Sequence, residues 1–194
     1  MPNPPVAVLS YDDLRRQADQ FLAQHHPTGT LPIPIEEIIE LRLGIQIVVE
    51  ACLRPVCRID GLPARDGTAI YIDGGVWLHP SQNRCRFSLA EELAHIRLHA
   101  AVFAALEYNT LAEYKTAVTS IDEQKRGWIE WQAKSWAGLV LVPSAKLEES
   151  VERLSAANTS VEGDLKDYMV NNQLADEFAV STDVIERRRT KENV

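Results

Sequence analysis

Apolar residues recur at intervals of three and four over several stretches of the chain, as on the buried face of an amphipathic helix. Residues 11–25 show this spacing clearly, with Leu14, Ala18, Phe21 and Leu22 on one face and polar residues opposite. Together with caps and helix breakers, the same spacing predicts helices over residues 11–25, 35–43, 81–105, 125–142 and 144–154, and two short helices within residues 174–189 joined at residues 179–181. The polar, mixed segment between the third and fourth of these helices gives no clear prediction.

Two β-branched runs, residues 45–49 and 69–73, alternate in part and are bounded by glycine, which is typical of strands. Residues 75–79 are also apolar and predict a third strand or a hairpin return. These runs precede the helix over residues 81–105, and most of the remaining chain is helical. The predicted fold class is therefore α+β, with a small, mostly antiparallel sheet packed on that central helix and a helical C-terminal half.

Composition narrows the class of protein. The 194 residues are 45% hydrophobic and 25% charged, which fits one soluble globular domain, or one domain with a small appendage. The net charge of −8 disfavours general binding to nucleic acid or to anionic membranes. No apolar run approaches the roughly 20 residues of a membrane span, and residues 1–5 lack the features of a signal peptide. Three cysteines without zinc-finger spacing suggest reduced thiols, so we expect a cytoplasmic protein.

The central helix carries a candidate metal site. Glu91, His95 and His99 recur at i, i+4 and i+8 and therefore lie along one side of the helix. A carboxylate and an imidazole one turn apart can chelate a divalent metal ion, and the adjacent Glu92 can then act as a general base on a water molecule. This is the arrangement of the metalloprotease helix H-E-x-x-H, with Glu91 in place of the first histidine.

Two structural interpretations of Glu91 stand beside the metal site. Residues 88–91 fit a capping box, in which Glu91 would bond to the N-cap amide of a helix that begins at Ser88. A helix entered earlier, with Ser81 as its N-cap, would instead leave Ser88 in the interior. Alternatively, Glu91 and His95 form an i, i+4 ion pair on a solvated face, worth only a few tenths of a kcal/mol.

Two segments of the sequence resemble the same protein family. Residues 86–99 (RFSLAEELAHIRLH) resemble the R-F-T-L-A-H-E-L-G-H-x-x-L-H helix of the ImmA/IrrE metallopeptidases. Residues 130–143 (EWQAKSWAGLVLVP) are similar to that family's E-x-E-A-N-x-F-A-x-x-L-L-M-P segment without a gap. The lead-in over residues 33–45 and the tail over residues 174–181 are similar as well. The resemblance therefore spans most of residues 30–189.

The resemblance implies a zincin-like fold and the activity of a metal-dependent endopeptidase. Several members of the family cut or inactivate a helix-turn-helix repressor, so such a repressor is the expected protein substrate. Position by position, Glu91 stands where the first metal histidine would be, Glu92 where the general base would be, and His95 at the second ligand. Glu130, from the downstream helix, matches the third ligand. His99 matches a further family histidine whose role stays open.

The departures from the family pattern bear on the metal. Zinc is expected first, because a carboxylate oxygen binds zinc at a distance similar to that of a histidine nitrogen. Two carboxylates and one imidazole nevertheless form a harder donor set than two imidazoles and a carboxylate, which shifts the preference toward manganese or iron(II) as alternatives. Gln132 stands where the family often has Glu, and Lys134 where it often has Asn. Because Lys134 lies one turn after Glu130, it could pair with that carboxylate and compete with the metal.

The predicted organisation is a lead-in and helix over residues 1–30, a zincin-like domain over residues 31–160, and a helical tail over residues 161–194 packed on the same domain. Two other functions stay open. One is a binding or regulatory protein that kept the peptidase fold but lost catalysis, which the Glu91 replacement favours. The other is DNA binding through the helix-turn-helix spacing of the tail, which the surrounding acidic residues disfavour. The sequence makes no prediction of the oligomeric state.

Overall fold

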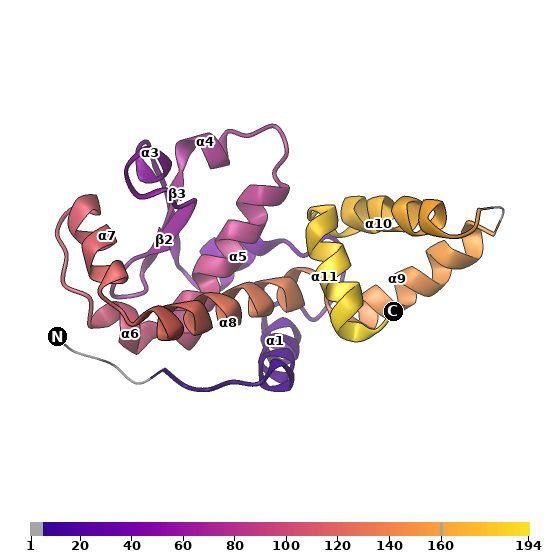
Figure 1. The fold of residues 1–194 in the computed structure, drawn as a ribbon, viewed down its shortest axis with the longest axis horizontal. Helices are drawn as coiled ribbons and strands as arrows, with labels where there is room; N and C mark the ends of the chain where they lie inside the picture. Colours follow the sequence, from indigo (N-terminus) through magenta and orange to yellow (C-terminus); the bar gives the residue numbers. More distant parts are fainter. Residues whose placement is uncertain (1–5, 160) are drawn as a thin grey trace.

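Two long helices form the centre of the fold. The computed structural model describes residues 6–159 and 161–194. Within it, α5 (Asn83–Leu98) packs against α8 (Glu123–Leu141), and α1 (Tyr11–His25) packs against α8. Figure 1 shows α5 and the sheet on one side of α8, α1 on the other, and the C-terminal helices together at one end. The other elements are α2 (Ile35–Glu37), the π-helical turn η1 (Ile38–Arg42), β1 (Gln46–Glu50), α3 (Leu53–Cys57), β2 (Gly61–Pro63), β3 (Ala69–Asp73), α4 (Gly74–Trp77), α6 (Ala100–Ala104), α7 (Leu111–Thr119), α9 (Ser144–Ala157), α10 (Asp164–Phe178) and α11 (Thr182–Glu192).

The first helix forms as its apolar spacing predicts. Its four predicted core residues, Leu14, Ala18, Phe21 and Leu22, are all buried. Ser10 and Asp13 form a capping box at its N-terminus, which satisfies amides that have no partner within the helix. Phe21 meets the fully buried Trp136 of α8 edge-on, with ring centroids 5.1 Å apart. This contact fixes α1 against α8, the helix that contains Glu130.

The sheet has three strands in the order β1-β3-β2. β1 pairs with β3 in parallel, from Gln46 opposite Ala69, and β2 pairs with β3 antiparallel, from Gly61 opposite Ile72. The α+β class is confirmed, but the sheet is mixed and not mostly antiparallel. The reason is the connection of residues 51–68, which carries α3 and the short β2 and is long enough to return the chain parallel to β1.

The apolar segment after β3 is a helix, α4, and not the predicted third strand. Asp73 ends β3 and caps α4, because its Oδ1 accepts the amide of Gly75 at 2.9 Å. Its Oδ2 accepts the amide of Arg54 at 2.9 Å, which ties α3 to the same point. A capped turn therefore replaces the hairpin return that residues 75–79 suggested.

The central helix begins at Asn83, with Gln82 at the N-cap position. Ser88 consequently lies inside the helix, so the capping-box interpretation of Glu91 is wrong. Ser81 is not the N-cap either, and its amide donates to His79 Nδ1 at 3.1 Å. The helix ends at Leu98, and a separate short helix, α6, covers part of the predicted extension to residue 105. Nine residues of α5 are buried, so the helix is covered on most of its surface.

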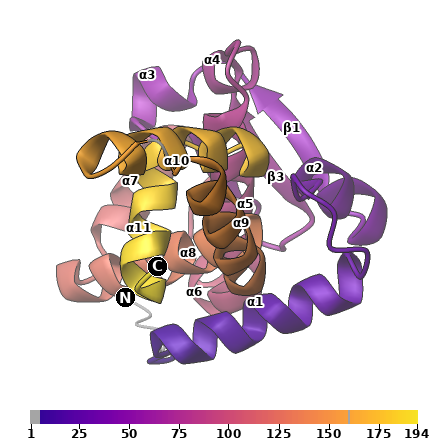
Figure 2. The ribbon, with the colours of Figure 1, turned by 90° about the vertical axis from the view of Figure 1, so that its right-hand side faces the viewer.

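The C-terminal helices meet α8 through a buried arginine. Ala179, in the left-handed region with a φ of 50°, ends α10, and Ser181 is the N-cap of α11, as the joint at residues 179–181 predicts. Arg188 of α11 donates to the carbonyl of Val142 from Nε at 3.1 Å and from Nη2 at 2.9 Å. Figure 2 shows α11 crossing the end of α8. The predicted three-part domain division stays a prediction.

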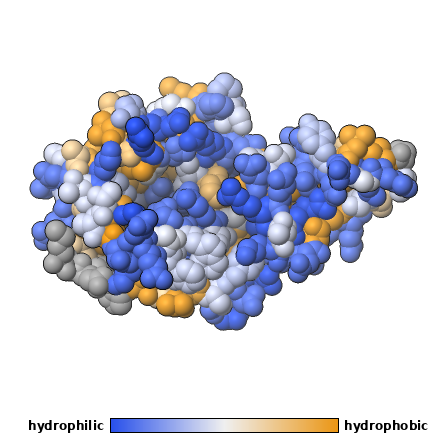
Figure 3. Space-filling view, in the orientation of Figure 1, coloured by the Kyte–Doolittle hydropathy of each residue, from blue (hydrophilic) through white to orange (hydrophobic). Residues whose placement is uncertain are grey.

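The surface is mainly hydrophilic on the face drawn in Figure 3, with apolar groups over α3 and at the far end of the α9–α10 pair. Val56 on α3, and Leu165 and Tyr168 on α10, are exposed apolar side chains in these regions. In the described part of the chain, no helix has both the length and the apolar character that crossing a bilayer requires.

Candidate metal centre

Two helices bring the predicted ligands together. Glu91 and His95 project from α5, and Glu130 projects from α8, which packs along it. One ligand atom from each of these three residues lies within 4.8 Å of the other two. Residues 39 positions apart in the chain, Glu91 and Glu130, thus reach the same point. The structure therefore contains a candidate metal-binding triad at the positions that the sequence singles out.

His95 presents one ring nitrogen to the triad and the other to the protein interior. Its Nε2 lies 3.8 Å from Glu130 Oε1. Its Nδ1 lies 3.2 Å from Nδ1 of His99, and His99 Nε2 lies 3.0 Å from Gln132 Oε1. The ring of Phe103 also packs against His95, with centroids 5.0 Å apart. These contacts hold the imidazole in one orientation, with Nε2 toward Glu130.

Lys134 supplies positive charge beside the triad. Its Nζ lies 3.8 Å from Glu91 Oε1 and 3.6 Å from Glu130 Oε2, so it faces both candidate carboxylate ligands. The pairing with Glu130 that its position one turn later suggests is present. Because the Lys134 side chain is half exposed, these contacts are solvated ion pairs of modest strength. They nevertheless compete with a cation for the same two carboxylates.

Glu92 lies against the edge strand β2. Its side chain is buried, and Gly61 of β2 is its close neighbour. A Cβ added at Gly61 would lie 3.0 Å from Glu92 Cγ and 3.0 Å from the Tyr71 carbonyl oxygen, so the backbone approaches here more closely than a side chain allows. The absence of a side chain at position 61 therefore leaves room for the Glu92 carboxyl group.

A cavity of about 390 Å³ contains these groups, and it is large enough to admit part of a peptide. Glu91, Glu92, His95 and Glu130 all line it. Its rim is charged: Asp60 holds Arg84 through two hydrogen bonds, to Nε at 2.5 Å and to Nη2 at 2.8 Å. The candidate site is thus a polar depression bounded by fixed charges.

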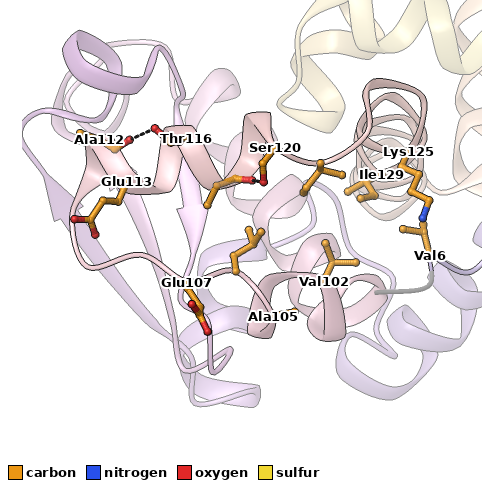
Figure 4. A pocket seen from close by; sticks show the side chains of 13 residues that line it. Val6, Val102, Ala105, Glu107, Ala112, Glu113, Thr116, Ser120, Lys125 and Ile129 are labelled. Carbon is orange, nitrogen blue, oxygen red and sulfur yellow. Dashed lines mark hydrogen bonds between the residues drawn. The ribbon is translucent and has the colours of Figure 1, made fainter. Parts of the chain in front are cut away.

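A second, apolar cavity of about 490 Å³ adjoins the first. It lies between α6, α7 and the start of α8, and Figure 4 shows Val102 and Ile129 pointing into it. The two cavities have Val102, Ile121 and Ile129 in common as walls. The polar site therefore has an apolar neighbour behind these side chains.

Burial is the main cause of the shifted acidities in the site. It raises the pKa of Glu91 to about 7, against the opposing attraction of Lys134. Burial, followed by the charges of Glu91 and Glu130, raises the pKa of Glu92 well above its ordinary value. Burial also lowers the pKa of His95 to about 3 and lowers the pKa of His99. Both imidazoles are therefore neutral near pH 7, the form that binds metals.

Comparison with known proteins identifies the family. The family model of the IrrE N-terminal-like domain, peptidase M78, matches residues 75–190, more than half of the chain. The chain belongs to the IrrE N-terminal-like domain family. No match is found among curated proteins.

A solved structure described as a Mycobacterium tuberculosis transcriptional regulator is similar to this IrrE N-terminal-like domain, with a TM-score of 0.57 and 20% sequence identity. The match covers 90% of this chain and 45% of that one, so the chain spans less than half the length of this neighbour. At this identity the likeness shows the fold alone.

Family and geometry agree on a metallopeptidase-type arrangement. In this IrrE N-terminal-like domain, the matched region contains both α5 and α8, and therefore every member of the triad. The donor set fits a divalent ion, because it combines two carboxylates with an imidazole whose second nitrogen is held by a protein partner. Glu91 is only 17% exposed at its side chain, and a buried carboxylate of this kind is stabilised by a cation.

Sequence reasoning missed two residues that line the site of this IrrE N-terminal-like domain, and it missed the role of a third that supports the site. Gly61 begins a three-residue strand, and Asp60 directly precedes it; a strand of this length is too short to give an alternating pattern. Gln132 stood out only as a departure from the family pattern, although it contacts His99. Its spacing of two residues from Glu130 gives no signal, because such neighbours do not share a helix face.

Proposed function

We propose that this protein is a metal-dependent endopeptidase. The observation that carries the proposal is the convergence of Glu91, His95 and Glu130 from two helices, beside the buried carboxyl group of Glu92 and within one cavity. In zinc hydrolases three protein ligands and a neighbouring carboxylate form the same set of functional groups.

Glu91, His95 and Glu130 would hold the ion, with zinc proposed first and manganese or iron(II) as alternatives. We propose that Glu91 takes the place of a histidine ligand, which adds one negative charge to the donor set. The bound ion would polarise a peptide carbonyl and make a water molecule more acidic. Because an additional carboxylate lowers the effective charge of the ion, we expect this acidification to be weaker than in a site with two histidines.

Glu92 would act as the general base. Its carboxylate would accept a proton from the attacking water and pass it to the amine nitrogen of the leaving peptide. A base should have a pKa near the working pH, and burial raises the pKa of Glu92 in that direction. The contact with Gly61 fixes the position of the carboxyl group at the edge of the sheet.

The proposed substrate is a protein, such as a helix-turn-helix repressor. The resemblance of residues 86–99 and 130–143 to the ImmA/IrrE peptidases supports it. Eighteen residues from four helices, one strand and the loops between them line the cavity, so an extended peptide segment could enter it.

Glu92→Gln tests the proposal. Removing the base should lower the cleavage rate of a repressor substrate by about 10²- to 10⁴-fold. The variant should retain zinc binding and its unfolding temperature, because the amide is close in shape to the carboxyl group. Cleavage by Glu92→Gln at the rate of the unchanged protein would refute the role of Glu92.

A second candidate function is a regulatory protein that binds the repressor without cutting it. The position of Lys134 favours this alternative, because its ammonium group already neutralises part of the charge of Glu91 and Glu130. Incubation with the repressor in the presence of zinc separates the two functions. Fragments indicate the peptidase, and a stable complex of intact chains indicates the binding protein.

DNA binding through the tail receives less support. The last helix carries three consecutive arginines, of which Arg188 is buried and paired with Glu192 at 2.5 Å. Arg189 donates to Asn171 at 2.7 Å and to the Val194 carbonyl at 3.0 Å. Two of the three arginine side chains are therefore engaged within the protein, and Arg187 is the exposed one. A salt-dependent gel shift would reverse this view.

A further inference from the structure

A chain of hydrogen bonds links the N-terminal segment to the candidate ligand His95. Gln132 Nε2 donates to the Ala7 carbonyl oxygen at 2.8 Å, and Gln132 Oε1 accepts from His99 Nε2 at 3.0 Å. His99 Nδ1 then lies 3.2 Å from His95 Nδ1. Gln132, His99 and His95 are 0%, 2% and 4% exposed, so the two contacts made by the imidazoles are shielded from solvent.

The donor and acceptor directions along this chain of hydrogen bonds follow from the Ala7 carbonyl oxygen at its start. A carbonyl oxygen only accepts, so the Gln132 atom that faces Ala7 must be the NH₂ group. The Gln132 oxygen is then turned to His99, whose Nε2 must carry a hydrogen in order to donate. A neutral His99 ring with a hydrogen on Nε2 has a lone pair on Nδ1. Each orientation is therefore dictated by the preceding contact.

The last contact sets the tautomer of His95. His99 Nδ1 is an acceptor, so the facing His95 Nδ1 must carry a hydrogen and donate. A neutral His95 ring then has its lone pair on Nε2, the nitrogen that lies 3.8 Å from Glu130 Oε1 in the triad. In the opposite tautomer, the Nε2 hydrogen would point into the triad, and two lone pairs would face each other between the imidazoles.

We propose that Gln132 and His99 are positioning residues, which hold His95 in the tautomer that offers Nε2 as a metal ligand, with the Ala7 carbonyl setting the direction of the chain. The inference rests on the proposed function, since it assigns the two residues a role in metal binding. Contacts of this kind orient metal-binding histidines, and their loss typically weakens metal binding by about 10- to 100-fold.

The test is a measurement of the ring-nitrogen chemical shifts of His95 and His99 in isotope-labelled, metal-free protein. Three proteins are compared: the unchanged chain, Gln132→Met, and Asn83→Leu as a matched control. Asn83 is also an amide side chain that donates to a distant backbone carbonyl, that of Val180 at 2.9 Å, but it does not contact the imidazoles. Zinc affinity of the three proteins is measured in a competition titration.

The unchanged protein should show a hydrogen on Nδ1 of His95 and on Nε2 of His99. Gln132→Met should redistribute both tautomers and weaken zinc binding by about 10- to 100-fold, whereas Asn83→Leu should change neither. A hydrogen on His95 Nε2 in the unchanged protein overturns the inference, even if Gln132→Met does not fold. Unchanged ring-nitrogen shifts in a folded Gln132→Met also overturn it.

The two proposals fail in different ways. Because the tautomers are read in metal-free protein, they decide the role of Gln132 and His99 directly. Lack of binding of zinc, manganese and iron(II) by the unchanged protein would refute the metal centre itself.

Discussion

Glu91 lies between a lysine and another carboxylate, with only 17% of its side chain exposed. Burial disfavours its charged form, and the neighbouring Glu130 adds repulsion that Lys134 only partly offsets. In the metal-free protein the ionised residue therefore carries a cost in folding free energy, and a cation in the triad would remove it.

This cost predicts how Glu91→Gln changes stability with pH. The pKa of Glu91 is about 7 in the folded protein and 4.5 ordinarily. Between these values the folded state binds more protons than the unfolded state, so the contribution of Glu91 to the free energy of unfolding falls as pH rises. A glutamine at this position does not titrate and therefore makes no such pH-dependent contribution. In the presence of a chelator, the stability of Glu91→Gln relative to the unchanged protein should rise across this window, by up to about 3 kcal/mol.

Urea unfolding at several pH values measures the effect. Comparing the two proteins at each pH cancels the contributions of His95 and His99, which have the opposite sign because burial lowers the pKa of both. A difference that stays constant with pH, or falls, would show that Glu91 is not a buried carboxyl group.

Lys134→Gln should strengthen zinc binding. The substitution removes an ammonium group that lies 3.8 and 3.6 Å from the two candidate carboxylate ligands. Solvated pairs of this kind contribute up to about 1 kcal/mol, which corresponds to about a fivefold gain in affinity. Lys146→Gln is the control, because Lys146 pairs with Glu149 at 2.8 Å on α9, outside the cavity. A competition titration measures both, and weaker zinc binding by Lys134→Gln would mean that Lys134 supports the site.

At the scale of elements, the edge strand β2 positions the candidate base. Gly61→Ala should displace Glu92, because the added Cβ meets Glu92 Cγ and the Tyr71 carbonyl oxygen at 3.0 Å, and the carbonyl belongs to the neighbouring strand. Overpacking of this kind costs about 1–3 kcal/mol of stability. Cleavage activity should fall with it.

Gly74→Ala provides the comparison. Its added Cβ would meet the Glu50 carbonyl oxygen at an ordinary 3.6 Å, and Gly74 begins the helix α4, where alanine is favoured over glycine. This variant should therefore keep its stability to within about 1 kcal/mol. Thermal unfolding and cleavage assays of both variants measure the difference, and equal losses would remove the argument from close approach.

The sequence predicts the long helices better than the elements around the sheet. The helices predicted over residues 11–25 and 144–154 have enough turns for a 3.6-residue period to appear, and both form, the second extending to residue 157. Residues 75–79 are too few to distinguish a strand from a helical turn, and the cap from Asp73 decides the outcome. The parallel pairing of β1 with β3 also depends on a long connection that no local pattern reveals.

The residues of the candidate site likewise include some that the sequence predicts and some that it does not. Glu91, His95 and Glu130 could be predicted because two of them share a helix face and the third lies in a segment with a recognisable pattern. Asp60, Gly61 and the contact of Gln132 with Ala7 could not be, because they arise from packing between distant segments. Local sequence spacing therefore identifies the candidate ligands, whereas the residues that surround them come together only through packing of distant segments.

At the scale of the whole molecule, the buried Arg188 ties α11 to the ends of α8 and α1. Arg188 and Glu192 are each 4% exposed at the side chain, and Arg188 also bonds to Val142 at the end of α8 and to Tyr11 of α1. Removing one partner of a buried pair leaves the other charge uncompensated, which typically costs about 3–5 kcal/mol. Arg188→Met should lower the free energy of unfolding by this amount.

The control is Arg153→Met. Arg153 pairs with Glu177 at 2.5 Å, but its side chain is 54% exposed, so its loss should cost less than about 1 kcal/mol. Chemical unfolding of both variants measures the contrast. Similar, small losses would show that the tail is not held to α8 and α1 through Arg188.

The central claim, that Glu91, His95 and Glu130 converge on one divalent ion, is tested most directly by diffraction from crystals grown with zinc, with data recorded on both sides of the zinc absorption edge. We expect one strong anomalous peak about 2.0–2.2 Å from His95 Nε2 and from a carboxylate oxygen of both Glu91 and Glu130. A zinc-containing crystal with no peak among these three residues, and with Lys134 Nζ still between the two carboxylates, would contradict the account.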